Sequence, residues 1–218
     1  MERQEFKELI LKAVQSKLFR FAVLLRRIGF ALGIVFGILT VPNSMNPVST
    51  IIGLIIGNCI TLFLIILPLF EILRAKDSQN FRDDCDFGLK YLRVSTIITL
   101  VASVLLVIAS LLLSVAVGTQ MVIVLVLSGV LLAYSIFQLE IINDLRNGLF
   151  YNIEKISYAG IYFALTLVFS VATIVFHGIN KSYFDLAAGI INSASQIIVA
   201  YFIFAANNKW KKEKLLSD

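Results

Sequence analysis

Residues 133–147 read AYSIFQLEIINDLRN and mark the place where a long apolar run passes into a polar segment. Two further stretches resemble it at a separation of 67 residues, namely ILPLFEILRAKDSQN at 66–80 and AYFIFAANNKWKKEK at 200–214. Arg26 and Arg93 keep the same separation of 67 residues. A repeat at a fixed period indicates a duplicated structural unit. The pattern therefore predicts one helical hairpin that occurs three times along the chain.

A few matched positions at the ends of the apolar runs carry this repeat. Phe137 matches Phe70 in the first comparison and Phe204 in the second, and Asp144 matches Asp77. In a true triplication the three phenylalanines should lie at one depth, with the aspartates at the cytoplasmic surface. The alternative is that aromatic residues recur because each helix meets the membrane–water interface at this point.

The composition places most of this chain in lipid. Of its 218 residues, 59% are hydrophobic and 15% are charged, and the mean hydropathy is +0.90. A soluble domain carries about 25% charged residues. The net charge of +5 does not indicate nucleic-acid binding, because the basic residues flank apolar runs, as they do in membrane proteins. The sequence therefore predicts an integral membrane protein in a lipid bilayer, with no nucleic-acid partner.

Six apolar runs are predicted to cross the membrane as helices. Each run has 21–24 residues, and roughly 20 are needed to cross a hydrocarbon core about 30 Å thick. Helices are expected because they satisfy their own backbone hydrogen bonds in lipid. The expected fold is an all-α, polytopic six-helix transmembrane bundle of residues 21–206, which can be grouped into three tandem hairpins. The predicted spans are 21–41, 50–70, 94–117, 121–142, 156–176 and 186–206.

Two shorter segments flank this bundle. Residues 1–20 are predicted to form an amphipathic helix on the cytoplasmic face of the membrane, since apolar residues recur at helical spacing opposite basic ones. The alternative position for this helix is against the protein's own cytoplasmic loops. Residues 207–218 form a basic tail. The basic character of the N-terminal helix favours contact with anionic lipid headgroups of the cytoplasmic leaflet.

The basic residues also set the orientation of the chain. Of the 19 basic residues, all but Lys181 lie on one side of the predicted membrane. That side is expected to be cytoplasmic, which places both termini and the loops at 71–93 and 143–155 in the cytoplasm. Arginines near span ends reach back to the headgroups, and tryptophan favours the interface. The predicted membrane-surface anchors are Arg26, Arg27, Arg93 and Trp210.

Two groups of residues within the spans are candidates for contacts between helices. Glycines four residues apart fall on one helix face and let another helix approach closely; they are Gly29, Gly33 and Gly37. Uncharged polar residues at depth either form hydrogen bonds between helices or line a polar cavity, and the first role is favoured. This polar set comprises Asn58, Thr61, Asn192, Ser195 and Gln196.

Enzymatic chemistry is not predicted. The chain has one histidine, His177, and no G-x-S-x-G, H-E-x-x-H or P-loop pattern. The acidic cluster of Asp83, Asp84 and Asp86 could bind a cation through its oxygens, but it is more typical of a solvated face paired with nearby basic residues. No catalytic residue, metal ligand or cofactor is therefore expected.

Two functions of different classes are compatible with these features. The favoured one is a non-enzymatic accessory, scaffold or oligomeric subunit of a membrane assembly, whose partners are other membrane subunits or further copies of the same chain. The alternative is a small channel or carrier for an uncharged or amphipathic solute, with the polar set gathered around the bundle axis.

Reporter fusions test the predicted orientation. Alkaline phosphatase fused after Gln120 should be active in a bacterial host, because this reporter needs disulfides that form outside the cytoplasm. The same reporter fused after Gly148 should be inactive, whereas green fluorescent protein at that point should fluoresce. Phosphatase activity from the Gly148 fusion would contradict the orientation.

Overall fold

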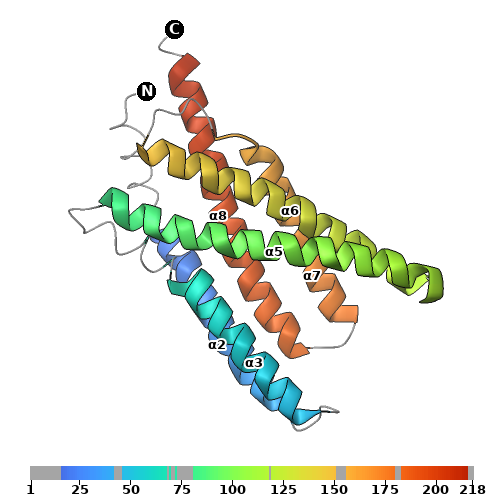
Figure 1. Ribbon diagram of the computed structural model, residues 1–218. Coiled ribbons are helices and arrows are strands. Elements are labelled where there is room, and N and C mark those ends of the chain that lie inside the picture. The colour runs from blue at the N-terminus through green and yellow to red at the C-terminus, as the bar shows by residue number, and fades with distance from the viewer. Residues whose placement is uncertain are drawn as a thin grey trace.

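The computed structural model describes residues 16–41, 46–67, 69, 72, 81–117, 119–150, 156–179 and 183–215. The described residues contain no strand, so the predicted all-α class is confirmed for this part of the chain. Figure 1 shows the elements, which are α2 (Lys17–Thr40), α3 (Pro47–Thr61), the π-helix η2 (Leu62–Ile66), α5 (Phe81–Val117), α6 (Thr119–Phe150), α7 (Ala159–Ile179) and α8 (Tyr183–Leu215).

Four of these helices are long and apolar enough to cross a membrane. Their apolar stretches are Lys17–Leu39, Asp83–Leu112, Val124–Gly148 and Leu186–Lys209. The apolar stretches of α3 and α7 are shorter, at Pro47–Cys59 and Ala159–Val175. The structure therefore supports an integral membrane protein with four helices of spanning length in its described part, and the count of six spans stays a prediction.

Side-chain caps fix where the first two helices begin. The Ser16 hydroxyl accepts a hydrogen bond from the Phe19 backbone N–H at 3.0 Å, so α2 begins at Lys17. Asn46 accepts from the Ser49 N–H at 3.2 Å, with Pro47 in the first turn of α3. Most of the predicted surface helix at residues 1–20 lies outside the described residues, but its last four positions belong to α2.

The helix α5 begins earlier than the sequence pattern indicates. Residues 81–93, expected as part of a cytoplasmic loop, form its first turns, and the whole helix has 37 residues. Asp83 and Asp84 lie in the first turn, where negative charge favours the helix dipole. One turn apart on this segment, the rings of Phe87 and Tyr91 are 4.7 Å apart. Local side-chain pairs thus extend the helix beyond its apolar run. The helix α8 likewise extends beyond residue 206, through Leu215 into the predicted tail.

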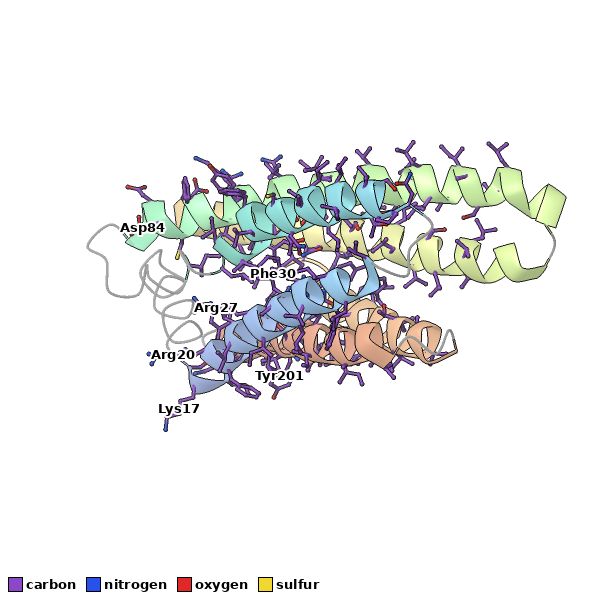
Figure 2. All side chains as sticks on the ribbon, turned by 90° about the horizontal axis from the view of Figure 1, so that it is seen from below. Lys17, Arg20, Arg27, Phe30, Asp84 and Tyr201 are labelled. Atoms are coloured by element: carbon purple, nitrogen blue, oxygen red, sulfur yellow. The ribbon has the colours of Figure 1, made fainter. Side chains whose placement is uncertain are left out.

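The α-helices of the described residues form a ring that follows the order of the chain. Successive helices pack side by side, with η2 linking α3 to α5, and α8 packs along α2 to close the ring. Figures 1 and 2 show two layers, with α3, α5 and α6 in one and α2, α7 and α8 in the other. The charged residues Lys17, Arg20 and Asp84 lie at the same end of the molecule (Figure 2).

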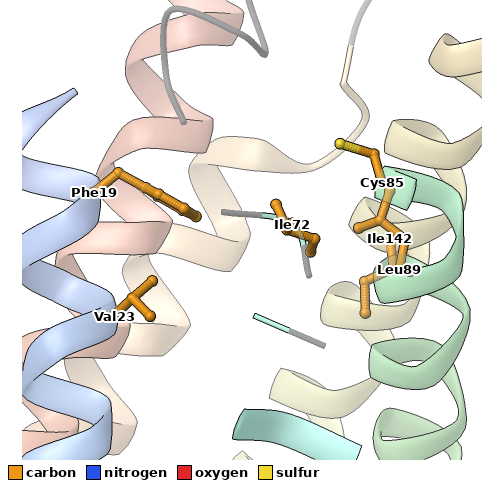
Figure 3. Close-up of a cluster of buried hydrophobic side chains, with 6 residues drawn as sticks. All are labelled: Phe19, Val23, Ile72, Cys85, Leu89 and Ile142. Atoms are coloured by element: carbon orange, nitrogen blue, oxygen red, sulfur yellow. The ribbon is translucent and has the colours of Figure 1, made fainter. Parts of the chain in front are cut away.

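A buried apolar cluster joins the two layers at this charged end. Figure 3 shows Ile72 between two residues of α2, Phe19 and Val23, and two residues of α5, Cys85 and Leu89. Ile142 of α6 completes the buried set. The ring of Phe19 also packs edge-on against Phe202 of α8, at 6.3 Å between centroids. The cluster therefore brings four helices together at one point.

Asp86 forms the charged contact between α5 and α6. Its carboxylate lies 2.7 Å from Arg146 Nε of α6 and 3.0 Å from Lys90 Nζ of its own helix. The side chain of Asp86 is buried, whereas that of Lys90 is 59% exposed. A carboxylate taken out of water needs such donors, because burying a lone charge is costly.

The turn before α7 is held by both neighbouring helices. The Ile156 N–H donates to Asn207 Oδ1 of α8 at 3.0 Å, and the Ser157 N–H donates to Asp144 of α6. Tyr158 has φ of 60°, a left-handed conformation that is uncommon for residues other than glycine. Its ring packs edge-on against Phe137 of α6 at 5.4 Å. These contacts together hold the turn in a conformation that its own residues do not prefer.

Part of the geometry expected from the repeat falls within the described residues. Phe137 packs on Tyr158, and Phe204 lies beside Gly160 and stacks on Phe163 at 5.5 Å. Both phenylalanines therefore lie near the start of α7. Phe70 and Asp77 lie outside the described residues. The triplication itself stays a prediction.

Replacing Asp86 tests the charged contact between α5 and α6. Asp86→Asn should lower the stability of the folded protein by about 2 kcal/mol, because Arg146 loses its charged partner. The measurement is the thermal midpoint of the purified protein in detergent. Lys90→Ala is the matched control and should cost less than about 1 kcal/mol, since its ammonium group is mostly solvated. An equal loss in both variants would contradict the assigned role of Arg146.

Candidate functional site

Two tyrosines from different helices form a buried pair inside the bundle. Tyr134 of α6 and Tyr162 of α7 are each 5% exposed. Their hydroxyl oxygens are 3.3 Å apart, and their rings stack with centroids at 5.4 Å. Tyr134 also stacks on Phe169 of α7 at 5.5 Å. The hydroxyls satisfy one another, which a buried phenol requires.

The predicted membrane-surface anchors Arg26 and Arg27 differ in exposure. The side chain of Arg26 is half-buried. Arg26 is predicted from the sequence to reach the headgroups, and this role stays a prediction. The neighbouring Arg27 is exposed, as expected for a residue turned about 100° around the helix. Arg93 of α5, the third predicted anchor, is also exposed.

The contact between α2 and α8 brings two predicted groups together. The Ser195 hydroxyl donates to the backbone carbonyl of Ala22 at 2.8 Å. A Cβ atom added at Gly29 would lie 2.4 Å from Asn192 Oδ1, so the glycine makes room for this side chain. Asn192 and Ser195 therefore lie at a helix–helix contact on either side of the level of Arg26.

The other two glycines of the predicted face behave differently from Gly29. A Cβ at Gly37 would meet the side chain of Leu54 of α3 at 2.4 Å, so this glycine faces the next helix. A Cβ at Gly33 would have no atom within 4 Å. Gly29 thus faces α8, Gly37 faces α3, and Gly33 between them is open.

The remaining predicted polar residues lie elsewhere. The Thr61 hydroxyl donates to the carbonyl of Gly57 in its own helix at 2.9 Å, and Asn58 lies half-buried on α3. Asn58 and Thr61 lie on α3, which packs on α2, whereas the other members of the polar set lie on α8. The structure therefore does not bring the whole polar set together at one place. Gln196 is half-buried, one turn after Asn192 on α8. Position 210 belongs to α8, but the side chain of Trp210 lies outside the described residues.

Most hydroxyls at depth bond to their own helix. Ser110, Ser135, Thr166 and Thr173 each donate to the carbonyl four residues earlier, at 2.7–2.8 Å. A cavity of about 170 Å³ lies between α5, α6 and α7, and it is lined mainly by apolar side chains. The two hydroxyls in its wall, those of Ser128 and Thr173, both donate to backbone carbonyls. In the described part of the chain, no group of three His, Cys, Asp or Glu residues is placed to hold a metal ion.

No family model, curated protein or solved structure matches this chain. The arrangement of its own side chains is therefore the basis for a functional proposal.

The aromatic and charged contacts of α6 were not identified from the sequence as a site. Tyr134 belongs to the repeated stretch 133–147, and the sequence pattern predicts no role for it beyond that of an aromatic residue at the membrane interface. Its partner Tyr162 lies 28 residues away on another helix. A useful signal is the presence of a polar hydroxyl on a large ring within an apolar run, because a buried phenol needs a partner.

A double-mutant cycle tests the contact between Gly29 and Asn192. Gly29→Ala should destabilise the protein by about 1–2 kcal/mol, because the added methyl group overlaps the Asn192 side chain. Gly33→Ala is the control, and it should be neutral or stabilising by up to about 1 kcal/mol through helix propensity. Adding Asn192→Ala to Gly29→Ala should restore about 1 kcal/mol of the free energy of unfolding, which is the coupling energy between the two positions. Unfolding in sodium dodecyl sulfate measures these differences, and additive effects would argue against the contact.

Proposed function

We propose that this chain is a non-enzymatic integral membrane protein that works as an accessory, scaffold or oligomeric subunit of a membrane assembly. The helix α3 supplies the contact with another membrane helix, from a second copy or from a different subunit. The observation that carries the proposal is an open small-residue face on the least packed helix of the bundle.

The position of α3 in the ring leaves much of its surface uncovered. It packs on α2, and its continuation η2 packs on α5. Ile51, Ile52, Ile55 and Ile56 are all exposed. An apolar helix with so little cover inside its own chain can be covered by lipid or by another helix.

Two glycines indicate that another helix, rather than lipid, contacts the exposed surface of α3. Gly53 and Gly57 are exposed and four residues apart, and a Cβ at either position would have no atom within 4 Å. Thr50 and Thr61 continue the same face at helical spacing. Small residues at this spacing let two backbones approach closely, and that approach drives helix association in membranes.

The use of polar residues inside the bundle supports the same function. Asn192 and Ser195 meet α2 at a close helix contact, and the tyrosine pair joins α6 to α7. Polar contacts between helices of this kind support the proposed function.

The proposal includes six spans with both ends in the cytoplasm. The helix α7 has 21 residues, which corresponds to about 31 Å at 1.5 Å per residue. The helix α3 has 15 residues and continues into the five residues of η2. The charged end that carries Lys17 and Arg20 would then face anionic headgroups of the cytoplasmic leaflet.

Substitutions on the open face of α3 test the proposed contact. Gly57→Leu, alone and with Gly53→Leu, should shift the protein from an assembly to a smaller particle, because the leucines keep the partner backbone away. Mass photometry after extraction in a mild detergent measures the particle mass, and mass spectrometry identifies any co-purifying protein.

Ile55→Leu, on the opposite face of α3, is the control and should leave the assembly intact. A wild-type protein that is strictly monomeric, with no co-purifying protein, would overturn the proposed function. An assembly that survives both glycine substitutions would show that α3 is not the contact.

A further inference from the structure

A crevice of about 170 Å³ lies between α5, α6 and α7, and it is open on one side. The helix α6 packs on both α5 and α7 (Figure 1), and it lines the crevice with Val124, Leu127 and Leu131. Leu106 of α5 and Phe169 of α7 also line it. Leu106 is 47% exposed, so the opening reaches the outer surface of the protein.

The stacked rings of Tyr134 and Phe169 lie at one end of this crevice. Their centroids are 5.5 Å apart, and Phe169 is itself part of the wall. Leu131 packs against the buried cluster that contains Tyr134. From Leu131 the crevice follows α6 back to Val124, which corresponds to about 10 Å along the helix. The crevice is therefore elongated, with aromatic rings at one end.

The two hydroxyls in the wall already donate to backbone carbonyls. Ser128 donates to the carbonyl of Leu125 at 3.0 Å. Thr173 donates to the carbonyl of Phe169 at 2.8 Å. A water molecule is held in a cavity only where it finds two or more polar partners, and apolar cavities of about 150 Å³ stay dry and take up apolar molecules. The wall of the crevice therefore favours an apolar ligand over water.

The size and place of the crevice decide between the apolar occupants that a membrane offers. A helix with its side chains is about 10–12 Å wide, so a 10 Å length of helix fills roughly 800 Å³. This is several times the volume of the crevice, whereas a lipid acyl chain is a narrow, flexible string of methylene groups. The lining residues lie in the apolar stretches of their helices, at Asp83–Leu112, Val124–Gly148 and Ala159–Val175.

We propose that this crevice binds one acyl chain of a bilayer lipid. The chain lies along α6, between Leu106 and Phe169. It replaces dispersion contacts that the walls of an open crevice would otherwise lack. Helices in lipid associate through such packing rather than through the hydrophobic effect, so the bound chain joins α5 to α7. The site is separate from the open face of α3, and its test does not depend on the proposed function.

Photo-labelling of the purified full chain tests the proposal. The probe is phosphatidylcholine with a diazirine in the middle of one acyl chain, mixed into phosphatidylcholine nanodiscs, and mass spectrometry measures the labelling of each residue. Two residues of α5 give the reference levels, since Leu105 is 62% exposed and Ser103 is fully buried. Leu127 and Leu131 should be labelled at least about fivefold more than Ser103, because a close-packed interior admits no lipid chain.

Labelling of Leu127 and Leu131 no higher than that of Ser103 would overturn the proposal. A protein segment that fills the crevice would give the same result, because it would exclude the lipid chain.

A substitution that fills the crevice separates this site from general contact with lipid. Val124→Phe should lower the labelling of Leu127 and Leu131 by at least about threefold, because the ring takes up part of the space. Val126→Phe is the matched control, since Val126 lies on the same helix outside the crevice and is 58% exposed. It should leave the labelling unchanged. Equal labelling in the wild type and Val124→Phe would contradict the site.

A second pair of variants keeps the test valid if Val124→Phe does not fold. Leu106→Phe fills the crevice from α5 and should also lower the labelling of Leu127 and Leu131 by at least about threefold. Leu105→Phe, at the neighbouring exposed position, is its control. Equal losses in Leu106→Phe and Leu105→Phe would show that the lipid chain is not held in the crevice.

Discussion

The contacts made by residues 133–147 of α6 are the constraint on which the rest of the structure depends. Arg146 holds α5 through the buried carboxylate of Asp86, and Tyr134 holds α7 through the tyrosine pair. Phe137 and Asp144 fix the turn that leads into α7. Helices in lipid gain little from burying apolar surface against each other, so specific packing and hydrogen bonds determine how they associate. One short stretch supplies several such contacts to two different helices.

The features that follow from composition and local periodicity could be predicted from the sequence. The apolar runs overlap the observed helices, and Gly29, Asn192 and Ser195 belong to residue types that favour helix contacts. The ends of the helices could not be predicted in the same way. Residues 81–93 are polar, and their helical state depends on side-chain pairs one turn apart rather than on hydropathy. The π-helix η2 likewise has no counterpart in the apolar pattern of its five residues.

The candidate site was hard to predict because its members come from separate helices. Arg26 and Arg27 are adjacent and chemically identical, and the sequence gives both the same route to the headgroups. The difference between them arises from the rotation of α2, which its contacts with α8 determine through Ala22 and Gly29. A helix turned by about 100° would exchange the two arginines. The environment of a single charge is thus set by packing at positions one turn away on either side.

The contact between α2 and α8 has a consequence for the biogenesis of the protein. Ser195 and Ala22 are 173 positions apart, so α2 is synthesised long before α8, the helix that closes the ring. Until then, the surface of α2 that later meets Asn192 and Ser195 has no partner from its own chain. A chain that stops before α8 therefore leaves the Ala22 carbonyl without the Ser195 hydroxyl, and it leaves the space beside Gly29 without the Asn192 side chain. This uncovered face of α2 distinguishes an unfinished chain from a finished one, which gives membrane quality control a physical feature to recognise.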